Sequence, residues 1–211
     1  VDPLGGRLVT GVSMDDYLVI FKETATYVVA GSGPNDLGQN DNYSSPQLLS
    51  SDIGCRDIKS VRQTPEGIFF MSNKGIRFLD RGLTISYIGS AVEDNNNDRV
   101  LSCEVLRNSD EVRFVMDTGK ILVYNYFFKR WAESTAPGAI DATIWKNSEY
   151  VYISTSKVLL EDPTTYLDDG SYVSLKIRWG WVRTKGIQGF QRLYRIALLG
   201  TYHTNHRFTY R

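Results

Sequence analysis

The residues with the clearest capacity for chemistry are two histidines near the end of the chain. His203 and His206 are the only histidines, and their spacing in HTNH offers two potential metal ligands. No cysteine or acidic residue lies near them in sequence, which favours two surface histidines on a terminal strand. A Ser–His–Asp triad stays open, although the chain has no Gly-x-Ser-x-Gly motif. We therefore assign no catalytic residue and expect a protein that is not an enzyme.

Two loops contain parts of ion-binding motifs. The stretch GSGPNDLG (Gly31–Gly38) starts like a phosphate loop, but Asp36 stands where the third glycine is required. A calcium loop begins with oxygen ligands at alternate positions, as the chain has at Asp94, Asn96 and Asp98. Arg99 then replaces the required glycine, and no bidentate glutamate follows at the right place. We expect no bound metal and no cofactor.

Acidic pairs and aromatic–basic runs are the remaining candidates. Adjacent acidic residues occur at Asp15-Asp16, Glu161-Asp162 and Asp168-Asp169, and Asp117-Thr-Gly119 resembles the Asp-box of sialidase propellers without its tryptophan. Glycosidases need two carboxyl groups facing each other across a sugar, whereas adjacent residues on a strand point to opposite faces. Solvated turns are therefore the favoured interpretation.

The runs YNYFFKRW (Tyr124–Trp131) and RWGWVRTK (Arg178–Lys185) could stack on sugars or bases. The alternative is a strand with one buried aromatic face and one solvated basic face, and we favour it.

The composition predicts a folded β-rich protein. The 211 residues are 42% apolar with zero net charge, and 13 Tyr and 9 Phe favour strands. No apolar run approaches the roughly 20 residues of a membrane span. Cys55 and Cys103, the only cysteines, are expected to be buried free thiols.

A repeated hairpin pattern organises the chain. In TPEGIFFMSNKGIRFLDRGL (Thr64–Leu83), two apolar runs flank the turn Ser72–Gly75, where Asn and Gly tolerate positive φ. The same pattern recurs three times, so that Ile20, Phe70, Phe114 and Tyr152 occupy matching positions at spacings of 50, 44 and 38. We expect these four side chains to be buried between neighbouring units.

Further short runs flank the hairpins. Runs precede them at Leu8–Val12, Ile58–Arg62, Val100–Leu106 and Ala142–Trp145, and follow three of them at Gln47–Leu49, Leu83–Ile88 and Phe127–Trp131. Four short strands in each unit of 40–50 residues are typical of a β-propeller blade. The predicted fold class is all-β, with about four blades in an incomplete ring followed by a C-terminal β-segment. Because four units are few for a closed ring and the chain begins with Val1, we expect part of a longer protein.

Loop and charge patterns divide the chain. Gly31–Asp52 is a long polar loop, expected to be exposed and to contact other subunits or another component of an assembly. Ser171–Arg211 has no acidic residue but eight basic ones, so it carries +8 while residues 1–170 carry −8. We predict propeller-like blades over 1–170 and a basic segment of a second β-domain over 171–211.

Three stretches carry a resemblance to a known family. They are SSDIGCRDIKSVRQTPEGIFFMSNKGIRFLDRGLTISYIGSAVED (Ser50–Asp94), KRW (Lys129–Trp131) and GIQGFQRLYRIALLG (Gly186–Gly200). Together they resemble the tail nozzle proteins of short-tailed bacteriophages, also called tail tubular protein B, and the resemblance extends from about Leu8 to Gly200. Members of that family are several times longer than this chain.

The resemblance implies a structural virion protein of the phage tail, assembled in the host cytoplasm. It implies a homo-oligomer of six copies that contacts the tail adaptor and the tail fibre or tailspike proteins. DNA would pass during ejection without specific binding. The alternative is a carbohydrate-binding or glycan-cleaving propeller used in host recognition.

Overall fold

The protein is built almost entirely from short antiparallel strands. The structure, a computed structural model, describes residues 4–39, 42–136, 138–146, 149–162, 164–165, 167–172 and 197. Contacts group the chain into two units, Val1–Thr165 and Tyr166–Arg211. The described helical segments are two short 3-10 helices, η1 (Ile58–Ser60) and η2 (Gly89–Asn95). The predicted all-β class is confirmed.

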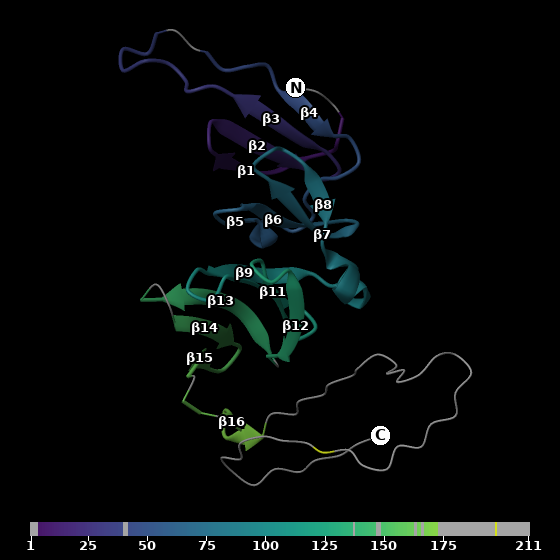
Figure 1. Cartoon of the computed structure of the whole chain (residues 1–211), viewed down its shortest axis with the longest axis vertical. Coiled ribbons are helices and arrows are strands. Elements are labelled where there is room, and N and C mark those ends of the chain that lie inside the picture. The colour runs from purple at the N-terminus through teal and green to yellow at the C-terminus, as the bar shows by residue number, and fades with distance from the viewer. Residues whose placement is uncertain are drawn as a thin grey trace, which may run out of the picture. The chain divides into compact units, whose positions relative to one another are not determined.

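The first unit contains four small sheets in chain order, which we call blades 1 to 4 (Figure 1). Each strand pairs antiparallel with its sequence neighbour. Blade 1 consists of β1 (Leu8–Met14), β2 (Tyr17–Lys22), β3 (Thr26–Ala30) and β4 (Gln47–Ser50). Blade 2 consists of β5 (Arg62–Gln63), β6 (Gly67–Ser72), β7 (Gly75–Asp80) and β8 (Ile85–Tyr87). Blade 3 consists of β9 (Val100–Leu106), β10 (Glu111–Met116), β11 (Lys120–Asn125) and β12 (Arg130–Thr135). Blade 4 consists of β13 (Ala139–Trp145), β14 (Glu149–Ser154) and β15 (Val158–Leu160).

The four predicted hairpins are the central strand pairs of the four blades. In blade 2 the turn between β6 and β7 closes with Ser72 opposite Gly75. The hydroxyl of Ser72 donates to the carbonyl of Gly75 at 2.8 Å and accepts from the Lys74 N–H at 3.0 Å. Positive φ falls on Gly75 (+88°) and not on Asn73, so glycine alone supplies the left-handed residue.

The flanking strands differ from prediction in three places. The run Ile58–Arg62 is mostly η1, because the Ser60 hydroxyl donates to the carbonyl of Asp57 and accepts from a backbone N–H of β6. Strand β8 begins at Ile85 rather than Leu83, whose φ is +62°. Strand β12 begins at Arg130, because the residues before it form the turn from β11.

Three apolar clusters lie between successive blades, and alternation along the strands supplies them. In β6, Ile68 and Phe70 join the cluster shared with blade 1, whereas Phe69 and Met71 join the cluster shared with blade 3. A third cluster joins blades 3 and 4 around Val115 and neighbouring side chains. Successive side chains of a strand point to opposite faces, so one strand serves two cores.

The prediction that the four side chains at matching hairpin positions are buried is correct for two of them. Phe70 and Phe114 are fully buried. Ile20 and Tyr152 are only half-buried. In β2 the buried positions facing blade 2 are Val19 and Phe21, so Ile20 points to the other face.

The outer faces of the terminal blades have no described neighbour. In blade 1, Leu18 and Leu48 are 43% and 47% exposed. In blade 4, Val158 and Leu160 are 70% and 53% exposed. These apolar side chains stay exposed because each lies on the face opposite an inter-blade cluster.

Both cysteines are free and buried, as expected. Cys55 packs in the cluster between blades 1 and 2, and Cys103 packs in the cluster between blades 2 and 3. Burial raises the pKa of Cys55 to about 12 and also raises that of Cys103, so both remain protonated at neutral pH.

The described part of the second unit is one hairpin. Strands β16 (Leu167–Asp168) and β17 (Ser171–Tyr172) pair across Asp169 and Gly170, which have φ of +47° and +82° as a type I′ turn requires. The predicted boundary after residue 170 falls inside this hairpin. Most of the basic segment 171–211 lies outside the described residues, so its role as part of a second β-domain stays a prediction.

The inter-blade cores predict a large stability effect at Phe70. Its ring lies 4.7 Å from that of Phe21 across the interface of blades 1 and 2. Phe70→Ala should lower the free energy of unfolding by about 3–5 kcal/mol, measured by urea titration. Phe127→Ala is the matched control, because this ring is 68% exposed and its loss should cost about 0.5 kcal/mol or less. Equal effects of the two substitutions would show that the blade packing is wrong.

Candidate functional site

The first strands of blades 2 to 4 converge on one surface. Strand β9 contacts β13 along its length and also contacts β5 and η1. In a propeller the strands that meet in this way border the central axis, while the fourth strands form the rim. Side chains of the first strands that point away from their own cores therefore gather on a shared surface.

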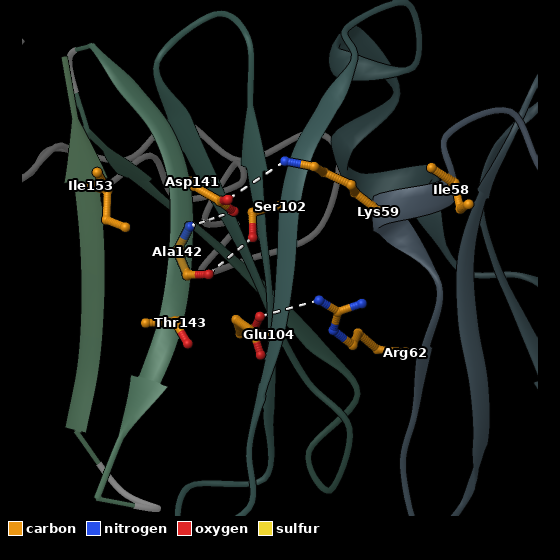
Figure 2. Close-up of a pocket in the computed structure, with 9 residues that line it drawn as sticks. All are labelled: Ile58, Lys59, Arg62, Ser102, Glu104, Asp141, Ala142, Thr143 and Ile153. Atoms are coloured by element: carbon orange, nitrogen blue, oxygen red, sulfur yellow. Dashed lines mark hydrogen bonds and ion pairs between the residues drawn. The ribbon is translucent and has the colours of Figure 1, made fainter.

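A groove of about 470 Å³ lies on this surface (Figure 2). Its lining residues come from blades 2, 3 and 4, and they are Ile58, Lys59, Arg62, Ser102, Glu104, Asp141, Ala142, Thr143 and Ile153. The polar groups of this set face one another across blade boundaries, as the dashed lines in Figure 2 show.

Two ion pairs cross the groove from blade 2. Lys59 Nζ lies 3.5 Å from an Asp141 carboxylate oxygen in blade 4, with the two side chains 56% and 46% exposed. Arg62 donates to Glu104 of blade 3 at 3.1 Å, and these side chains are 36% and 20% exposed. Each cation is thus engaged by a carboxylate from another blade, which links the three inner edges.

Ser102 connects blades 3 and 4 beneath these pairs. Its hydroxyl, on β9, lies 3.2 Å from the Ala142 carbonyl of β13, to which it can donate. Partial burial by itself raises the pKa of Asp141. The Ser102 hydroxyl, which can donate to Asp141 in place of the Ala142 carbonyl, acts together with the Ala142 N–H and the charge of Lys59. These groups outweigh that effect and hold the pKa of Asp141 below its usual value.

Other inter-blade polar contacts lie away from the groove. Arg56, which precedes η1, donates to the Asn96 carbonyl at 2.8 Å and to the Asp57 carboxylate at 2.9 Å. Asp57 in turn accepts from the Val100 N–H at 3.1 Å, where β9 begins. These bonds join the start of blade 2 to the loop that enters blade 3.

Arg113 forms a second clamp, between blades 3 and 4. Its guanidinium donates to Glu111 at 2.8 Å and to Glu161 at 2.6 Å, and it lies 4.7 Å from the centre of the Tyr150 ring. Burial alone would lower the pKa of Arg113, but the hydrogen bonds that it donates to Glu161 and Glu111, with the charges of these carboxylates, raise the pKa above its usual value. The residue is therefore a permanently charged cross-link.

The arrangement in the groove is suited to holding blades together. Its two cations and two carboxylates neutralise each other, so the groove offers polar atoms without excess charge. No histidine or cysteine is among its lining residues. Across the part of the chain that the structure describes, no three His, Cys, Asp or Glu side chains gather as a metal site would require.

The residues considered for calcium do not converge. The carbonyls of Asn96 and Asp98 accept hydrogen bonds from Arg56, and the Asp98 carboxylate accepts from Thr118 at 3.1 Å. Asp94 is exposed. Here η2 ends at Asn95 and the chain passes into a turn.

The other stretches singled out by sequence lie mainly in turns. Asp117 lies in the turn between β10 and β11 and accepts from the Arg99 N–H at 3.1 Å. Asp15 pairs with Arg81, and Glu161 pairs with Arg113. The side chain of Asp168 lies outside the described residues, as do His203, His206 and the run Arg178–Lys185.

The run Tyr124–Trp131 combines both proposed environments. Tyr124 and Tyr126 are buried in the cluster between blades 2 and 3, and Trp131 packs against it. Phe127 and Phe128 are instead each 68% exposed. The prediction of a strand with a buried aromatic face thus holds at both ends of the run. It does not hold at Phe127 and Phe128, where the chain turns.

The groove residues Lys59, Arg62, Glu104 and Asp141 were missed by sequence reasoning. The available signal was that charged residues occur in two of the runs that precede a hairpin, Ile58–Arg62 and Val100–Leu106, and that Asp141 directly precedes a third. Repeat alignment located those runs but not which of their side chains would meet across blades.

Comparison with known proteins extends only to the fold. PorZ, an essential bacterial surface component of the type-IX secretion system of Porphyromonas gingivalis, is similar over 81% of this chain and 23% of its own, at 12% identity and a TM-score of 0.52. The extracellular domain of BT4673 from B. thetaiotaomicron matches over 75% of this chain and 27% of its own, at 14% identity and a TM-score of 0.44. The chain thus spans about a quarter of each. No protein family matches the chain, and no curated protein matches its sequence.

Among the described residues, no helix is long and apolar enough to cross a membrane.

The depressed pKa of Asp141 predicts a pH-dependent contribution to stability. A lowered folded-state pKa stabilises the fold above the unfolded value of 3.8, and this stabilisation is lost as the pH falls through the folded-state pKa. Asp141→Asn should therefore cost about 0.2–1 kcal/mol at neutral pH, because the pair is half-exposed, and much less in strong acid. Urea unfolding at the two pH values measures this. Asp36→Asn, an exposed loop position, is the control, and an equal cost at both pH values would contradict the assignment.

Proposed function

We propose that this chain forms blades of a tail nozzle protein, of the tail tubular protein B type, in a short-tailed bacteriophage. It would be a structural, non-enzymatic virion component bordering the path of DNA ejection. The resemblance of Ser50–Asp94, Lys129–Trp131 and Gly186–Gly200 to that family motivates the proposal. The all-β blade architecture is compatible with it.

One observation carries the structural role. The charged groups of the first-strand groove pair with one another across blade boundaries, in Lys59–Asp141 and Arg62–Glu104. A binding or catalytic groove would leave such groups directed at a ligand. Here they link blades, as suits a scaffold that bears load.

The assembly partners follow from the resemblance. We propose a homo-oligomer of six copies, assembled in the host cytoplasm, that contacts the tail adaptor and the tail fibre or tailspike proteins. The long connection between β3 and β4 supports contacts of this kind, since its tip exposes Leu37 to 80%.

DNA would pass without being gripped. The eight basic residues of Ser171–Arg211 are dispersed rather than clustered, and arginine is well suited to pair bidentately with carboxylates. A lumen that held phosphates at every turn would stall ejection. We therefore favour docking of this segment on acidic protein surface, either in the same chain or in a neighbour.

A carbohydrate-binding or glycan-cleaving propeller used in host recognition is the second candidate. A hollow of about 390 Å³ beside β12 favours it, because aromatic and basic side chains, Tyr124, Trp131, Lys129 and Arg130, line it together. Aromatic rings stack on sugars, and cations bind acidic sugars. The tryptophan of this hollow is committed to a hydrogen bond with the Ile88 carbonyl, at 2.8 Å, so we place this function second.

The assembly state separates the two candidates. The nozzle function predicts a particle of six copies by mass photometry and six-fold class averages by electron microscopy. A monomer that binds a glycan array, and loses that binding in Lys129→Ala, would instead establish the alternative.

Absence of DNA binding is a separate expectation. Purified protein titrated with labelled duplex DNA at roughly physiological salt, where the screening length is about 8 Å, should show no tight binding. Phosphate contacts would release counterions and make affinity fall steeply with salt. Submicromolar affinity with a steep salt dependence would reverse the preference for protein docking.

A further inference from the structure

Blades 1 and 3 present equivalent ends to solvent. In a sheet of consecutive antiparallel strands, the turn between strands one and two and the connection between strands three and four lie at the same end. In blade 1 these meet through a hydrogen bond from the Gly31 N–H to the Asp16 carbonyl at 3.3 Å. In blade 3 the matching bond joins the Tyr126 N–H to the Asp110 carbonyl at 2.9 Å.

The end of blade 1 is acidic and apolar. We define the acidic patch as Asp36, Leu37 and Tyr43 of the connection between β3 and β4, together with Asp16 at the base of this connection. Leu37 and Tyr43 are 80% and 56% exposed, and both aspartates are exposed. Within the described residues, no cation pairs with either aspartate, whereas neighbouring Asp15 is bound by Arg81.

The loop that carries Leu37 is ordered by its own hydrogen bonds. The side-chain oxygen of Asn35 accepts from the Leu37 N–H at 3.1 Å and from the Gln39 N–H at 2.9 Å. The Gly38 N–H donates to the Asn35 carbonyl at 2.8 Å. Leu37 is therefore held outward by a closed turn, and little conformational entropy would be lost on docking.

The equivalent end of blade 3 is basic and aromatic. We define the basic patch as Arg107, Phe127, Phe128, Lys129 and Arg130. The two phenylalanine rings stack edge to face with centres 4.9 Å apart. Of the described carboxylates, none pairs with the three cations, and nearby Asp110 is engaged by the Tyr126 hydroxyl.

This turn is also built to hold its rings in solvent. The Asn125 side chain accepts from the Phe128 N–H at 2.8 Å and donates to the Ser109 carbonyl at 2.9 Å. Lys129 closes the turn with φ of +53°. Fixed, exposed aromatic side chains beside a cation are the residue types that dominate protein interfaces.

We propose that the acidic patch of one copy docks on the basic patch of another copy, and the reverse, so that the two copies face each other. The inference rests on the proposed oligomer and names its contact surfaces. The patches match in chemistry, since each joins exposed apolar side chains to unpaired charges of opposite sign. Blade 2 stands between them in one chain, so each patch must find its complement on another molecule. Because both patches lie at the same end of their blades, two facing copies cover all four patches in one isologous contact.

Charge reversal in the full 211-residue chain tests the contact. Lys129→Glu with Arg130→Glu should weaken assembly about tenfold or more, because like charges would face the acidic patch. Asp16→Lys with Asp36→Lys should do the same. In a mixture of the two reversed proteins, every contact between unlike copies joins opposite charges, so mixing them should restore assembly. All four changes combined in one chain should also restore it. Sedimentation velocity over a concentration series measures each.

Matched controls and an uncharged variant complete the design. Asp94→Lys and Arg99→Glu reverse exposed charges in the loop at the opposite end of the blades and should leave assembly unchanged. Phe127→Ser with Phe128→Ser removes the aromatic anchors without touching charge and should also weaken assembly, while thermal melting confirms that each variant folds.

Three outcomes would overturn the inference. Six-membered particles that are indifferent to every patch variant would refute this contact while leaving the nozzle function standing. A parent chain that stays monomeric at all concentrations would refute both. Parent particles weakened by the reversals but not restored by the fourfold combination would assign the patches to different partners and refute their pairing.

Discussion

The fold depends on the inability of one small antiparallel sheet to bury both of its faces alone. Strand β6 makes the constraint visible, since all six of its residues are buried. Ile68 and Phe70 are covered by blade 1, and Phe69 and Met71 by blade 3. Removal of either neighbour would expose one complete row, so no blade is stable independently of the next. Stacked repeats stabilise each other through such shared interfaces.

Apolar burial is not directional, so polar contacts must set how the blades align. Arg56, Arg62 and Arg113 each reach a carboxylate or carbonyl of a following blade or loop. A guanidinium has five donors in a fixed plane and therefore specifies angle as well as distance. The half-exposed pairs add little free energy individually, but together they hold the inner edges in register. The same contacts occupy the charges that a ligand site would need.

The rim has the opposite character. Inner charges are paired and inner apolar groups are buried, whereas the ends of blades 1 and 3 hold Leu37 and Phe127 in solvent on ordered turns. Hydrogen bonds from nearby backbone N–H groups to the side chains of Asn35 and Asn125 maintain both turns. The contacts that hold the blades together thus lie on the side of the central axis, and the periphery is left for contacts with other molecules.

The sequence by itself determined the blades. Two-residue alternation and turn residues such as Gly75 act over a few positions, so the hairpins and the all-β class were predictable from Ile68–Leu79 and its repeats. Only the tertiary structure decided which face of each strand meets which neighbour. The burial of Val19 and Phe21 in place of Ile20, the pairing of Lys59 with Asp141 across two blades, and the exposure of Phe127 all depend on residues distant in the chain. The two-residue alternation of apolar side chains defines a strand and its two faces. Which neighbour covers each face depends on residues far away in the sequence, and this alternation cannot encode that information.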